Sequence, residues 1–388
     1  MQNGIKNFIN KKKDVITLKK IKVLRIIGEC KTGGVETIAL NYYKNIDHRK
    51  IQMDFLFYGD ITNEFREPLE KNGDNAISVT DYQKNLFKSI LDIRNVVKKG
   101  NYDIVHSQLN ALNFFPLLGA WFGGAKIRIA SNHSTANLKY EFKKSIIKYI
   151  LRPTTGLLAN YYTSCSKYAG IWAFGKRNFK KGKIKIIRNA IDLTKFSFDE
   201  RVRTRKRKEL NIDDNTFVVG HVGRFVKQKN HKFIIEIFNE LLKKNKNSVL
   251  LLIGDGSLQN DIKNYATKLG IVENIKFLGI RYDVNELMQA MDVFLFPSIY
   301  EGLGNVITES QAVALHSLSS TAVPHEVKMT EYAEFLSLND SAKTWANKLL
   351  IYNKKYKRRN THNDLIEQGY EIKTAAANLL EYYESLVV

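Results

Sequence analysis

The stretch Phe296–Gln311, which reads FPSIYEGLGNVITESQ, decides the fold. The apolar run Val293–Phe296 before it predicts a buried strand that stops at Pro297. A glycine-containing turn follows, and the helix predicted after that turn carries Glu309, eight residues beyond Glu301. In an open α/β sheet such a strand-to-helix junction lies at the carboxyl end of the strand, where ligands bind.

The chemistry of this junction suits a phosphorylated sugar. A helix N-terminus offers free backbone N–H groups and partial positive charge to a phosphate, and Gly302 and Gly304 let the backbone approach it closely. Glu301 and Glu309 can accept hydrogen bonds from hydroxyl groups on either side of that phosphate. The alternative is an ordinary glycine turn with surface glutamates, since exposed glutamate is common on helices. The rest of the chain decides between the two interpretations.

Length and composition limit the class of protein. The chain has 388 residues, more than one ordinary core holds, which predicts two domains. It has 44% hydrophobic and 26% charged residues, no apolar run of 18 or more, and no secretory signal in its basic extension, residues 1–20. Its two cysteines, Cys30 and Cys165, exclude a disulfide framework and a cysteine-based zinc site, and they fit a reducing cytoplasm.

The formal net charge of +22 favours anionic partners: nucleic acid, an acidic membrane face or phosphorylated substrates. Zinc-finger spacing, RNA-recognition signatures and basic-zipper heptads do not occur, and a generally basic, solvated surface is the alternative. The helix predicted at Lys139–Arg152 sets Lys144, Lys148 and Arg152 opposite an apolar stripe. Such a helix suits an anionic membrane surface, although the stripe equally fits a helix that faces the core.

The first half of the chain alternates strands and helices. The strand Ile21–Ile27 ends in a loop with Gly33 and Gly34 and leads into a helix, a geometry that binds phosphate but also occurs in plain turns. Later strands end near His106 and His133, and two histidines on one rim favour a site over two structural groups. The other strands expected in this half are Ile51–Tyr58, Ala76–Val79, Leu157–Asn160, Tyr162–Cys165 and Ile184–Ile187.

The second half restarts this alternation after the charge run Asp199–Lys208, so the domain boundary is expected between residues 190 and 212. Its first strand ends in Gly223 and Arg224, with Lys229 close behind. The next strand ends in a loop made of Gly254, Asp255 and Gly256. Alternation throughout predicts an α/β protein with parallel sheets covered on both faces. The last elements expected are a strand at Leu318–Val323, a helix at Ala342–Tyr352 and one helix near 362–386.

The polar groups at these strand ends fit a nucleoside diphosphate sugar. Arg224 and Lys229 suit the diphosphate, and the two glutamates suit the hydroxyls of ribose and hexose. No Asp-x-Asp pair occurs in the chain, so a chelated metal is not indicated, and the two cations can supply its electrostatic stabilisation. Neither a metal nor another cofactor is expected.

These residues resemble the retaining glycosyltransferases of family 4, which have the GT-B fold. The family's E-x7-E motif matches Glu301 and Glu309 within PSIYEGLGNVITESQA. The segments GRFVKQKNH, GDG, IRNAID and RIIGECKTGGVET also agree in order and spacing, so that the resemblance covers about residue 21 to 388. It is strongest to bacterial exopolysaccharide and capsule transferases.

The resemblance implies a role for each matching position. Arg224 and Lys229 would bind the diphosphate and stabilise the leaving nucleoside diphosphate, Glu301 would contact the donor sugar and Glu309 the ribose. His133 would lie near the reaction centre on the acceptor side. The remaining implied contacts are a loop beside the phosphate and acceptor, Gly33 and Gly34, and donor-binding backbone groups at Gly302, Leu303, Gly304 and Asn305.

The resemblance also implies an architecture and a reaction. Two Rossmann-like domains, residues 21–195 on the acceptor side and 212–365 on the donor side, would face a cleft, and a C-terminal helix, 366–388, would pack back on the first domain. The expected reaction moves a hexose-type sugar, without metal and with retention, from a nucleoside diphosphate donor, UDP favoured. The acceptor would be a lipid-linked, growing cell-surface polysaccharide at the inner face of the membrane, and nucleic acid is not an expected partner.

Departures from the family keep other functions open. Relatives usually read Ala-Gly-Leu-Pro after the motif helix, whereas Ala314-Leu315-His316 lacks the glycine and the proline, and Ser320-Thr321 replaces a common Ser-Asp pair. Both changes are expected beside the donor pocket. They motivate a nucleotide-sugar-binding protein with degenerate activity as the alternative. A nucleotide-sugar epimerase of the same architecture is a second alternative, and a nucleic-acid-binding protein a third, on charge alone.

Overall fold

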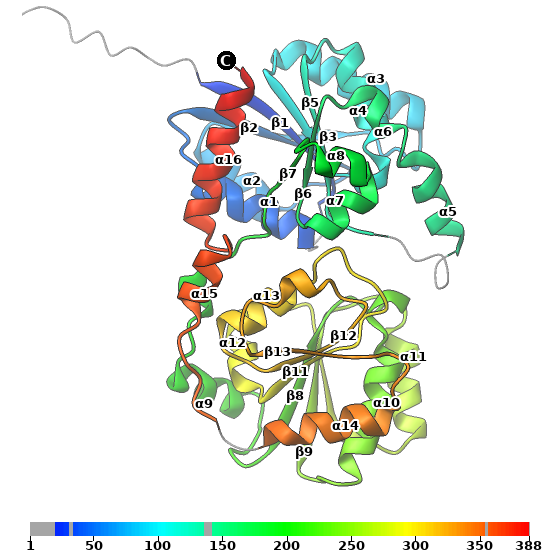
Figure 1. The fold of residues 1–388 in the computed structure, drawn as a ribbon, viewed down its shortest axis with the longest axis vertical. Helices are drawn as coiled ribbons and strands as arrows, with labels where there is room; N and C mark the ends of the chain where they lie inside the picture. The colour runs from blue at the N-terminus through cyan, green and yellow to red at the C-terminus, as the bar shows by residue number, and fades with distance from the viewer. Residues whose placement is uncertain (1–19, 31–33, 136–141, 354–355, 388) are drawn as a thin grey trace, which may run out of the picture.

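The chain folds into two α/β domains stacked one above the other, in a computed structural model that describes residues 20–30, 34–135, 142–353 and 356–387 (Figure 1). Each domain is built on one parallel sheet, of seven strands in the first domain and six in the second. Among the described helices, none is both long and apolar enough to cross a membrane. The segment expected as a basic extension lies outside the described residues, except for Lys20.

The N-terminal domain has the strand order β3-β2-β1-β4-β5-β6-β7. Its strands are β1 Ile21–Glu29, β2 Ile51–Tyr58, β3 Ala76–Val79, β4 Ile104–Ser107, β5 Ile127–Asn132, β6 Tyr161–Ser164 and β7 Ile184–Ile186. Its helices are α1 Gly34–Asn45, α2 Asn63–Lys71, α3 Leu86–Gly100, α4 Phe114–Phe122, α5 Phe142–Leu151, α6 Thr155–Leu158, α7 Lys167–Phe174 and α8 Lys176–Lys180, with a 3-10 turn η1 at Asn110–Leu112. The central strands are buried on both faces, as long runs of β-branched and aromatic residues require.

The C-terminal domain has the strand order β10-β9-β8-β11-β12-β13. Its strands are β8 Phe217–Val222, β9 Ser248–Ile253, β10 Ile275–Gly279, β11 Val293–Phe296, β12 Ser317–Ser320 and β13 Ala333–Leu336. Its helices are α9 Glu200–Glu209, α10 His231–Leu242, α11 Gln259–Lys268, α12 Val284–Ala290, α13 Asn305–Ala312, α14 Ala342–Leu350 and α15 His362–Glu367. Short 3-10 turns lie at η2 Leu193–Phe196, η3 Lys227–Lys229, η4 Val272–Asn274, η5 His325–Val327 and η6 Ile351–Asn353.

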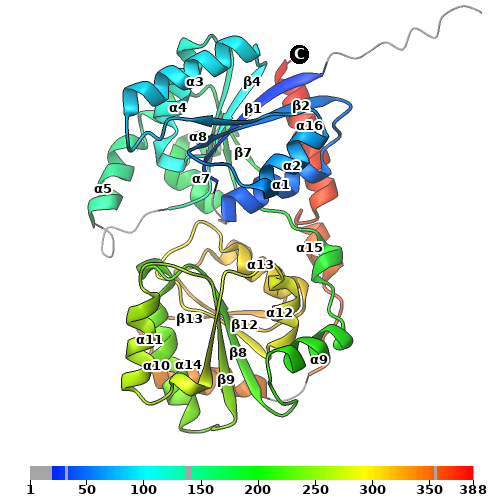
Figure 2. The same cartoon turned by 180° about the vertical axis from the view of Figure 1, so that it is seen from behind.

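The last helix, α16 Ile372–Val387, crosses back to the N-terminal domain, where it lies beside α1 in both ribbon views (Figures 1 and 2). Its buried side chains join the core that α1 and α2 form over the first sheet, with Leu379, Leu380 and Tyr383 at 5% exposure or less. At the start of α16, the Ile372 amide donates to the Ile191 carbonyl at 3.1 Å. The carboxyl terminus is therefore part of the first domain's core.

Three sequence expectations differ from the structure. The strand expected at Leu157–Asn160 is helix α6, in which Leu158 packs in a small core with α4 while Leu157 is 78% exposed. The strand expected at Leu318–Val323 ends at Ser320, and β13 follows where none was expected. The single C-terminal helix is two helices, α15 and α16, separated at Gly369, whose positive φ of 79° ends the first.

Candidate active site at the domain interface

The carboxyl ends of the two sheets meet across the domain interface, and the turn between β11 and α13 lies directly in it. Thr135, beyond β5, donates its hydroxyl hydrogen to the Glu301 carbonyl at 3.0 Å, and Ser166, beyond β6, donates to the Gly302 carbonyl at 2.9 Å. A Cβ on Gly302 would stand 2.0 Å from the carbonyl oxygen of His133. Only glycine permits this approach, so the turn and the acceptor-side domain are fitted to each other.

Lys229 and Glu301 form an ion pair inside this interface. The Lys229 ammonium lies 2.6 Å from a Glu301 carboxylate oxygen, and Glu301 is 7% exposed. The same ammonium lies 4.6 Å from the ring centroid of Phe296, the last residue of β11, which fixes its direction further. Strand ends β8 and β11 thus bring together two of the predicted site residues, which are 72 positions apart in the chain.

Arg224 follows the end of β8 and is exposed. Its charge acts on Glu36 of α1, opposing the burial that raises the pKa of that carboxyl. Arg224 therefore lies close to the helix that follows the Gly33-Gly34 loop of the other domain. Gly33 itself lies outside the described residues, whereas Gly34 starts α1, where an added Cβ would stand 3.2 Å from the Asn305 amide nitrogen.

The glycine loop after β9 packs backbone against backbone on the loop after β8. A Cβ on Gly254, whose φ is +131°, would lie 2.3 Å from the Gly223 carbonyl oxygen. One on Gly256 would lie 2.7 Å from the Phe225 carbonyl oxygen. Asp255 accepts the Gly256 amide hydrogen at 2.6 Å. The loop therefore supports the segment that carries Arg224.

The N-terminus of α13 points its backbone groups at the interface. Gly304 precedes the helix with a positive φ of 92° and has no side chain that could cap it. The first backbone N–H groups of the helix can therefore donate hydrogen bonds to a ligand. The Leu303 side chain is in the core at 1% exposure, so this residue can contribute only its backbone. The Asn305 amide oxygen accepts a hydrogen bond at 2.6 Å from Asn189, which follows β7.

Glu309 lies one turn further along α13 and is partly buried. Unlike Glu301, it has no ion-pair partner within the part of the chain that the structure describes. Burial raises the pKa of its carboxyl to about 7. It is therefore close to half-protonated at neutral pH, where a hydrogen bond from a ligand hydroxyl would favour the ionised form.

His133 and His106 have different surroundings. The His133 amide donates to the Asn110 side chain at 2.6 Å, and its Nε2 lies 2.9 Å from the Ser131 hydroxyl. Burial lowers the pKa of His133 to about 4, which keeps its ring neutral at pH 7. His106 lies deeper, at 1% exposure, and its two ring nitrogens are satisfied by Tyr383 at 2.7 Å and Thr163 at 3.1 Å. The structure brings His133 to the interface with Glu301 but holds His106 in the core.

Sequence reasoning missed four residues that join the domains: Thr135, Ser166, Asn189 and Glu326. The Glu326 carboxylate, on η5, accepts the amide hydrogens of the first two residues of α7 at 3.0 and 2.7 Å and lies 3.6 Å from Arg188. The motif IRNAID contains Asn189, and that motif was the only sequence signal available for any of the four. Their partners lie more than 100 positions away, beyond the reach of local patterns.

Comparison with protein families decides the identity. A family model described as Glycosyl transferases group 1 matches residues 202–372, and one described as Glycosyltransferase Family 4 matches residues 32–195. Together they take in both sheets and the interface between them. The chain is a glycosyltransferase with a Family 4 domain and a group 1 domain.

Curated relatives of this chain are bacterial proteins named as glycosyltransferases. Glycosyltransferase EpsF of Bacillus subtilis is 27% identical over 368 residues, 93% of this chain and 96% of that protein. The capsular polysaccharide biosynthesis glycosyltransferase CapH of Staphylococcus aureus is 24% identical, and the match covers 94% of this chain and 99% of CapH. An Escherichia coli enzyme named as UDP-Gal:alpha-D-GlcNAc-diphosphoundecaprenol alpha-1,3-galactosyltransferase is 26% identical over 323 residues, 78% and 80% of the two chains. The chain is therefore similar, over most of its length, to glycosyltransferases of bacteria.

Solved structures confirm the expected GT-B fold. Anabaena HepE in complex with UDP and glucose superposes with a TM-score of 0.77 at 19% identity and covers 94% of this chain and all of that one. WaaG, a glycosyltransferase involved in lipopolysaccharide biosynthesis, superposes with a TM-score of 0.68 at 15% identity. The match covers 95% of this chain and 98% of WaaG. At these identities the likeness establishes the fold of this glycosyltransferase.

Proposed function

We propose that the enzyme transfers a hexose from a UDP-sugar to a lipid-linked polysaccharide precursor, with retention of anomeric configuration and without a metal. The observation that carries the proposal is the Lys229–Glu301 ion pair, held at the interface beside the N-terminus of α13. A cation, a carboxylate and free backbone N–H groups in one place match the diphosphate and the hydroxyls of such a donor.

When a donor binds, Lys229 and Glu301 would contact different parts of it. The diphosphate attracts the Lys229 ammonium, which stabilises the charge that develops on the leaving UDP, and Arg224 adds a second cation from the same loop. Glu301 then exchanges its counter-ion for the hydroxyls of the donor sugar. Two protein cations in this role leave the reaction independent of a metal.

The position of His133 opposite the donor turn fits a role on the acceptor side. The His133 carbonyl lies against Gly302, so the acceptor and the donor sugar would meet beside this histidine. Its neutral ring can accept or donate a hydrogen bond without adding charge. The donor assignment also draws on HepE, whose structure was determined with UDP and glucose, and on the E. coli relative, whose name gives UDP-galactose as donor and a diphosphoundecaprenol acceptor.

A lipid-linked acceptor calls for a membrane-facing surface, and we place it on α3, α4 and α6. Large apolar side chains are exposed there, namely Phe87 at 81%, Leu91 at 53%, Trp121 at 52%, Phe122 at 54% and Leu157 at 78%. Figure 1 shows these helices on the side of the N-terminal domain away from α16, and Figure 2 shows the same for α3 and α4. We name these five side chains the apolar ridge.

The lysines beside the apolar ridge are not the cations that the sequence suggested for membrane contact, which belong to α5 and the residue after it. Lys148 donates to the Thr135 carbonyl at 3.4 Å and Arg152 to the Trp172 carbonyl at 2.8 Å, so both serve the protein's own structure. The Lys144 side chain lies outside the described part of the chain. Exposed lysines on α3 and after α4 replace them beside the ridge: Lys88, Lys98, Lys99 and Lys126. A ridge of aromatic and aliphatic side chains flanked by lysines suits the inner face of an anionic membrane.

The departure at Ala314–His316 gives little support to a degenerate, binding-only protein. Ala314 holds the left-handed conformation, φ +49°, that the family's glycine would adopt, at a cost of about 1–2 kcal/mol. His316 packs among aromatic rings, with Tyr352 at 4.4 Å and Tyr356 at 4.6 Å between centroids. Both residues follow the C-terminal end of α13, and the expectation that they lie beside the donor pocket stays a prediction. Ser320, by contrast, ends β12 and bonds the Ser298 carbonyl beside the donor turn.

A thermal-shift panel of UDP-, GDP- and ADP-sugars tests the donor site. A UDP-sugar at about one hundred times its Kd should raise the Tm by about 5 °C, and Lys229→Gln should abolish that rise. Lys243→Gln is the matched control, since this exposed lysine pairs with Glu240 away from the interface. A flat response of the wild type to every nucleotide sugar would contradict the proposal.

A further inference from the structure

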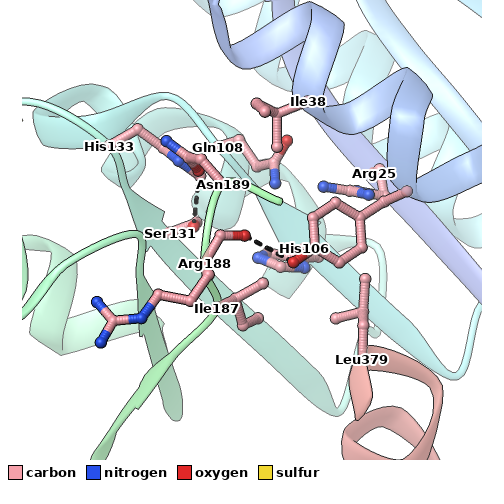
Figure 3. Close-up of a pocket in the computed structure, with 11 residues that line it drawn as sticks. Arg25, Ile38, His106, Gln108, Ser131, His133, Ile187, Arg188, Asn189 and Leu379 are labelled. Carbon is pink, nitrogen blue, oxygen red and sulfur yellow. Dashed lines mark hydrogen bonds between the residues drawn. The ribbon is translucent and has the colours of Figure 1, made fainter. Parts of the chain in front are cut away.

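Asn189 follows β7 and is a buried amide, 4% exposed, between two residues of the proposed site. Its Nδ2–H group donates to the side-chain oxygen of Asn305, the first residue of α13, at 2.6 Å. On its other side lies the ring of His133 (Figure 3). Burial lowers the pKa of His133, and the Asn189 amide opposes this shift, as an acceptor of the ring's hydrogen does. Asn189 therefore contacts one residue of each domain.

The two nitrogens of the His133 ring face different neighbours. Nε2 lies 2.9 Å from the Ser131 hydroxyl, the contact drawn as a dashed line in Figure 3. Nδ1 and the Asn189 oxygen Oδ1 are both buried, and among the described residues neither has a partner at full hydrogen-bond geometry. Hydrogen bonds in active sites are often long in the free enzyme and tighten in the substrate complex. Nδ1 and Oδ1 are thus a donor and an acceptor placed to meet.

The cavity that adjoins these groups is too small for a substrate. It holds about 10 Å³, the space of one water molecule. A sugar or a phosphate does not fit, so the side chain of Asn189 acts through its protein neighbours.

The two neighbours of Asn189 lie at opposite ends of the donor turn, residues 302–305. A Cβ on Gly302 would stand 2.0 Å from the carbonyl oxygen of His133, so the backbone of this histidine lies against the first residue of the turn. Asn305 is the last residue of the turn and the first of α13. One amide thus reaches both ends of the segment, directly at Asn305 and through His133 at Gly302.

We propose that Asn189 is a positioning residue that fixes both ends of the donor turn and holds His133 in the tautomer with its proton on Nδ1. Nδ1–H donates to Oδ1 of Asn189, and Nε2 accepts the hydrogen of the Ser131 hydroxyl. The bond from Nδ2 to Asn305 keeps the amide in this orientation. If both amides were reversed, the ring would carry its proton on Nε2, so the tautomer reports the orientation. The positioning role rests on the proposed function, in which the turn binds the donor.

Long-range ¹H–¹⁵N NMR of the full chain at pH 7, where the ring is neutral, measures the tautomer. The signals of His133 are assigned by their loss in His133→Gln, and the wild type should show the Nδ1–H form. Asn189→Ala removes the acceptor and should move the ring to the Nε2–H form, which donates to Ser131. Asn178→Ala, which removes a half-buried amide bonded to the Phe174 carbonyl, is the matched control and should keep the wild-type form. An Nε2–H ring in the wild type, or one tautomer shared by the wild type and Asn189→Ala, would overturn the proposal.

Asn305→Ala covers the case in which Asn189→Ala does not fold. This change lies in the other domain and frees the Asn189 amide to reverse, so His133 should become a mixture of both tautomers. A ring that stays wholly in the Nδ1–H form would contradict the coupling.

Calorimetric titration with UDP tests the effect on the donor turn. Asn189→Ala should weaken UDP binding about fivefold to tenfold, in line with the loss of one hydrogen bond, and Asn178→Ala should not change it. Equal UDP affinity of Asn189→Ala and the wild type would refute the positioning role. A wild type that binds no UDP would refute the proposed function instead, while the tautomers still decide whether Asn189 orients His133.

Discussion

Glu309 is the residue whose protonation state most directly affects the donor site. Burial raises the pKa of its carboxyl to about 7 in the folded protein from an ordinary 4.5. The unfolded chain therefore releases this proton first, so Glu309 makes its contribution to stability below about pH 4.5 and loses it as the pH rises to about 7. A ribose hydroxyl donates to the ionised form, so binding of UDP favours deprotonation.

We predict that UDP binds more tightly as the pH rises from 6 to 8. Below the pKa of Glu309 the affinity should increase by up to about tenfold for each pH unit. Isothermal titration calorimetry over this range measures the effect. Glu309→Gln should weaken binding and flatten the pH dependence, whereas Glu381→Gln, at an exposed position on α16, should change neither. An unaltered pH profile in Glu309→Gln would show that another group titrates.

Single residues divide into those that sequence could identify and those it could not. Arg224, Lys229, Glu301 and Glu309 could be predicted as one site because each follows a strand end or sits in a recognisable helix, and parallel strands bring those ends together. Whether each performs its proposed role is still a prediction. The core position of His106 could not be predicted, because its hydrogen bond with Tyr383 comes from α16, at the other end of the chain.

At the scale of elements, α7 carries a contact that spans the two domains. Its first amides donate to the carboxylate of Glu326 on η5, an arrangement in which a negative charge meets the positive end of a helix. Arg188 lies on the other side of the same carboxylate at 3.6 Å. Together with the contacts of Thr135 and Ser166, this interaction holds the domains close enough for donor and acceptor to meet.

We predict that Glu326→Gln weakens domain closure, because it removes the charge from both interactions. The KM for the donor should rise about fivefold to tenfold, in line with a loss of about 1–1.4 kcal/mol, while the Tm changes little. Steady-state kinetics with small-angle scattering measures the two consequences. Glu367→Gln, an exposed glutamate on α15, is the control. If Glu326→Gln leaves the KM and the scattering curve at wild-type values, the contact does not serve closure.

Most of the strands and helices were predictable, including short strands such as β3 and β11, but α6 and β13 were not. The strands around β1 and β8 follow from runs of β-branched residues, but β13 reads AEFL, four residues with a charge among them. At α6 the pair Leu157-Leu158 indicates a buried strand, whereas the structure buries one leucine and exposes the other. In these two four-residue elements the residue pattern is too weak to separate a strand from one helical turn.

At the scale of the whole molecule, the apolar ridge sets how the enzyme would meet a membrane. Trp121→Ser combined with Phe122→Ser should reduce binding to vesicles of anionic phospholipid at least about tenfold, since both side chains are about half exposed and available for insertion. The double variant should keep the wild-type Tm. Vesicle flotation measures the binding, with Tyr282→Ser, an exposed tyrosine of the other domain, as control. Flotation equal to wild type would place the membrane contact elsewhere.

The two-domain architecture was predictable from the repeated alternation of strands and helices, with a charge run between the halves. How far the domains close on each other was not, because closure rests on pairs such as Ser166 with Gly302 that lie 136 positions apart. The position of Ala314–His316 at the far end of α13 also needed the structure.

The central claim is retaining, metal-independent transfer from a UDP-sugar at the Lys229–Glu301 site. It is tested most directly by incubating the enzyme with a panel of α-configured UDP-hexoses and a polyprenyl-diphosphate sugar acceptor in excess EDTA, and by determining the product's anomeric configuration by NMR. The account predicts release of UDP and an α-linked product at a rate that EDTA does not change, with Glu301→Gln at least about 100-fold slower. A β-linked product, or a rate that EDTA abolishes, would contradict it.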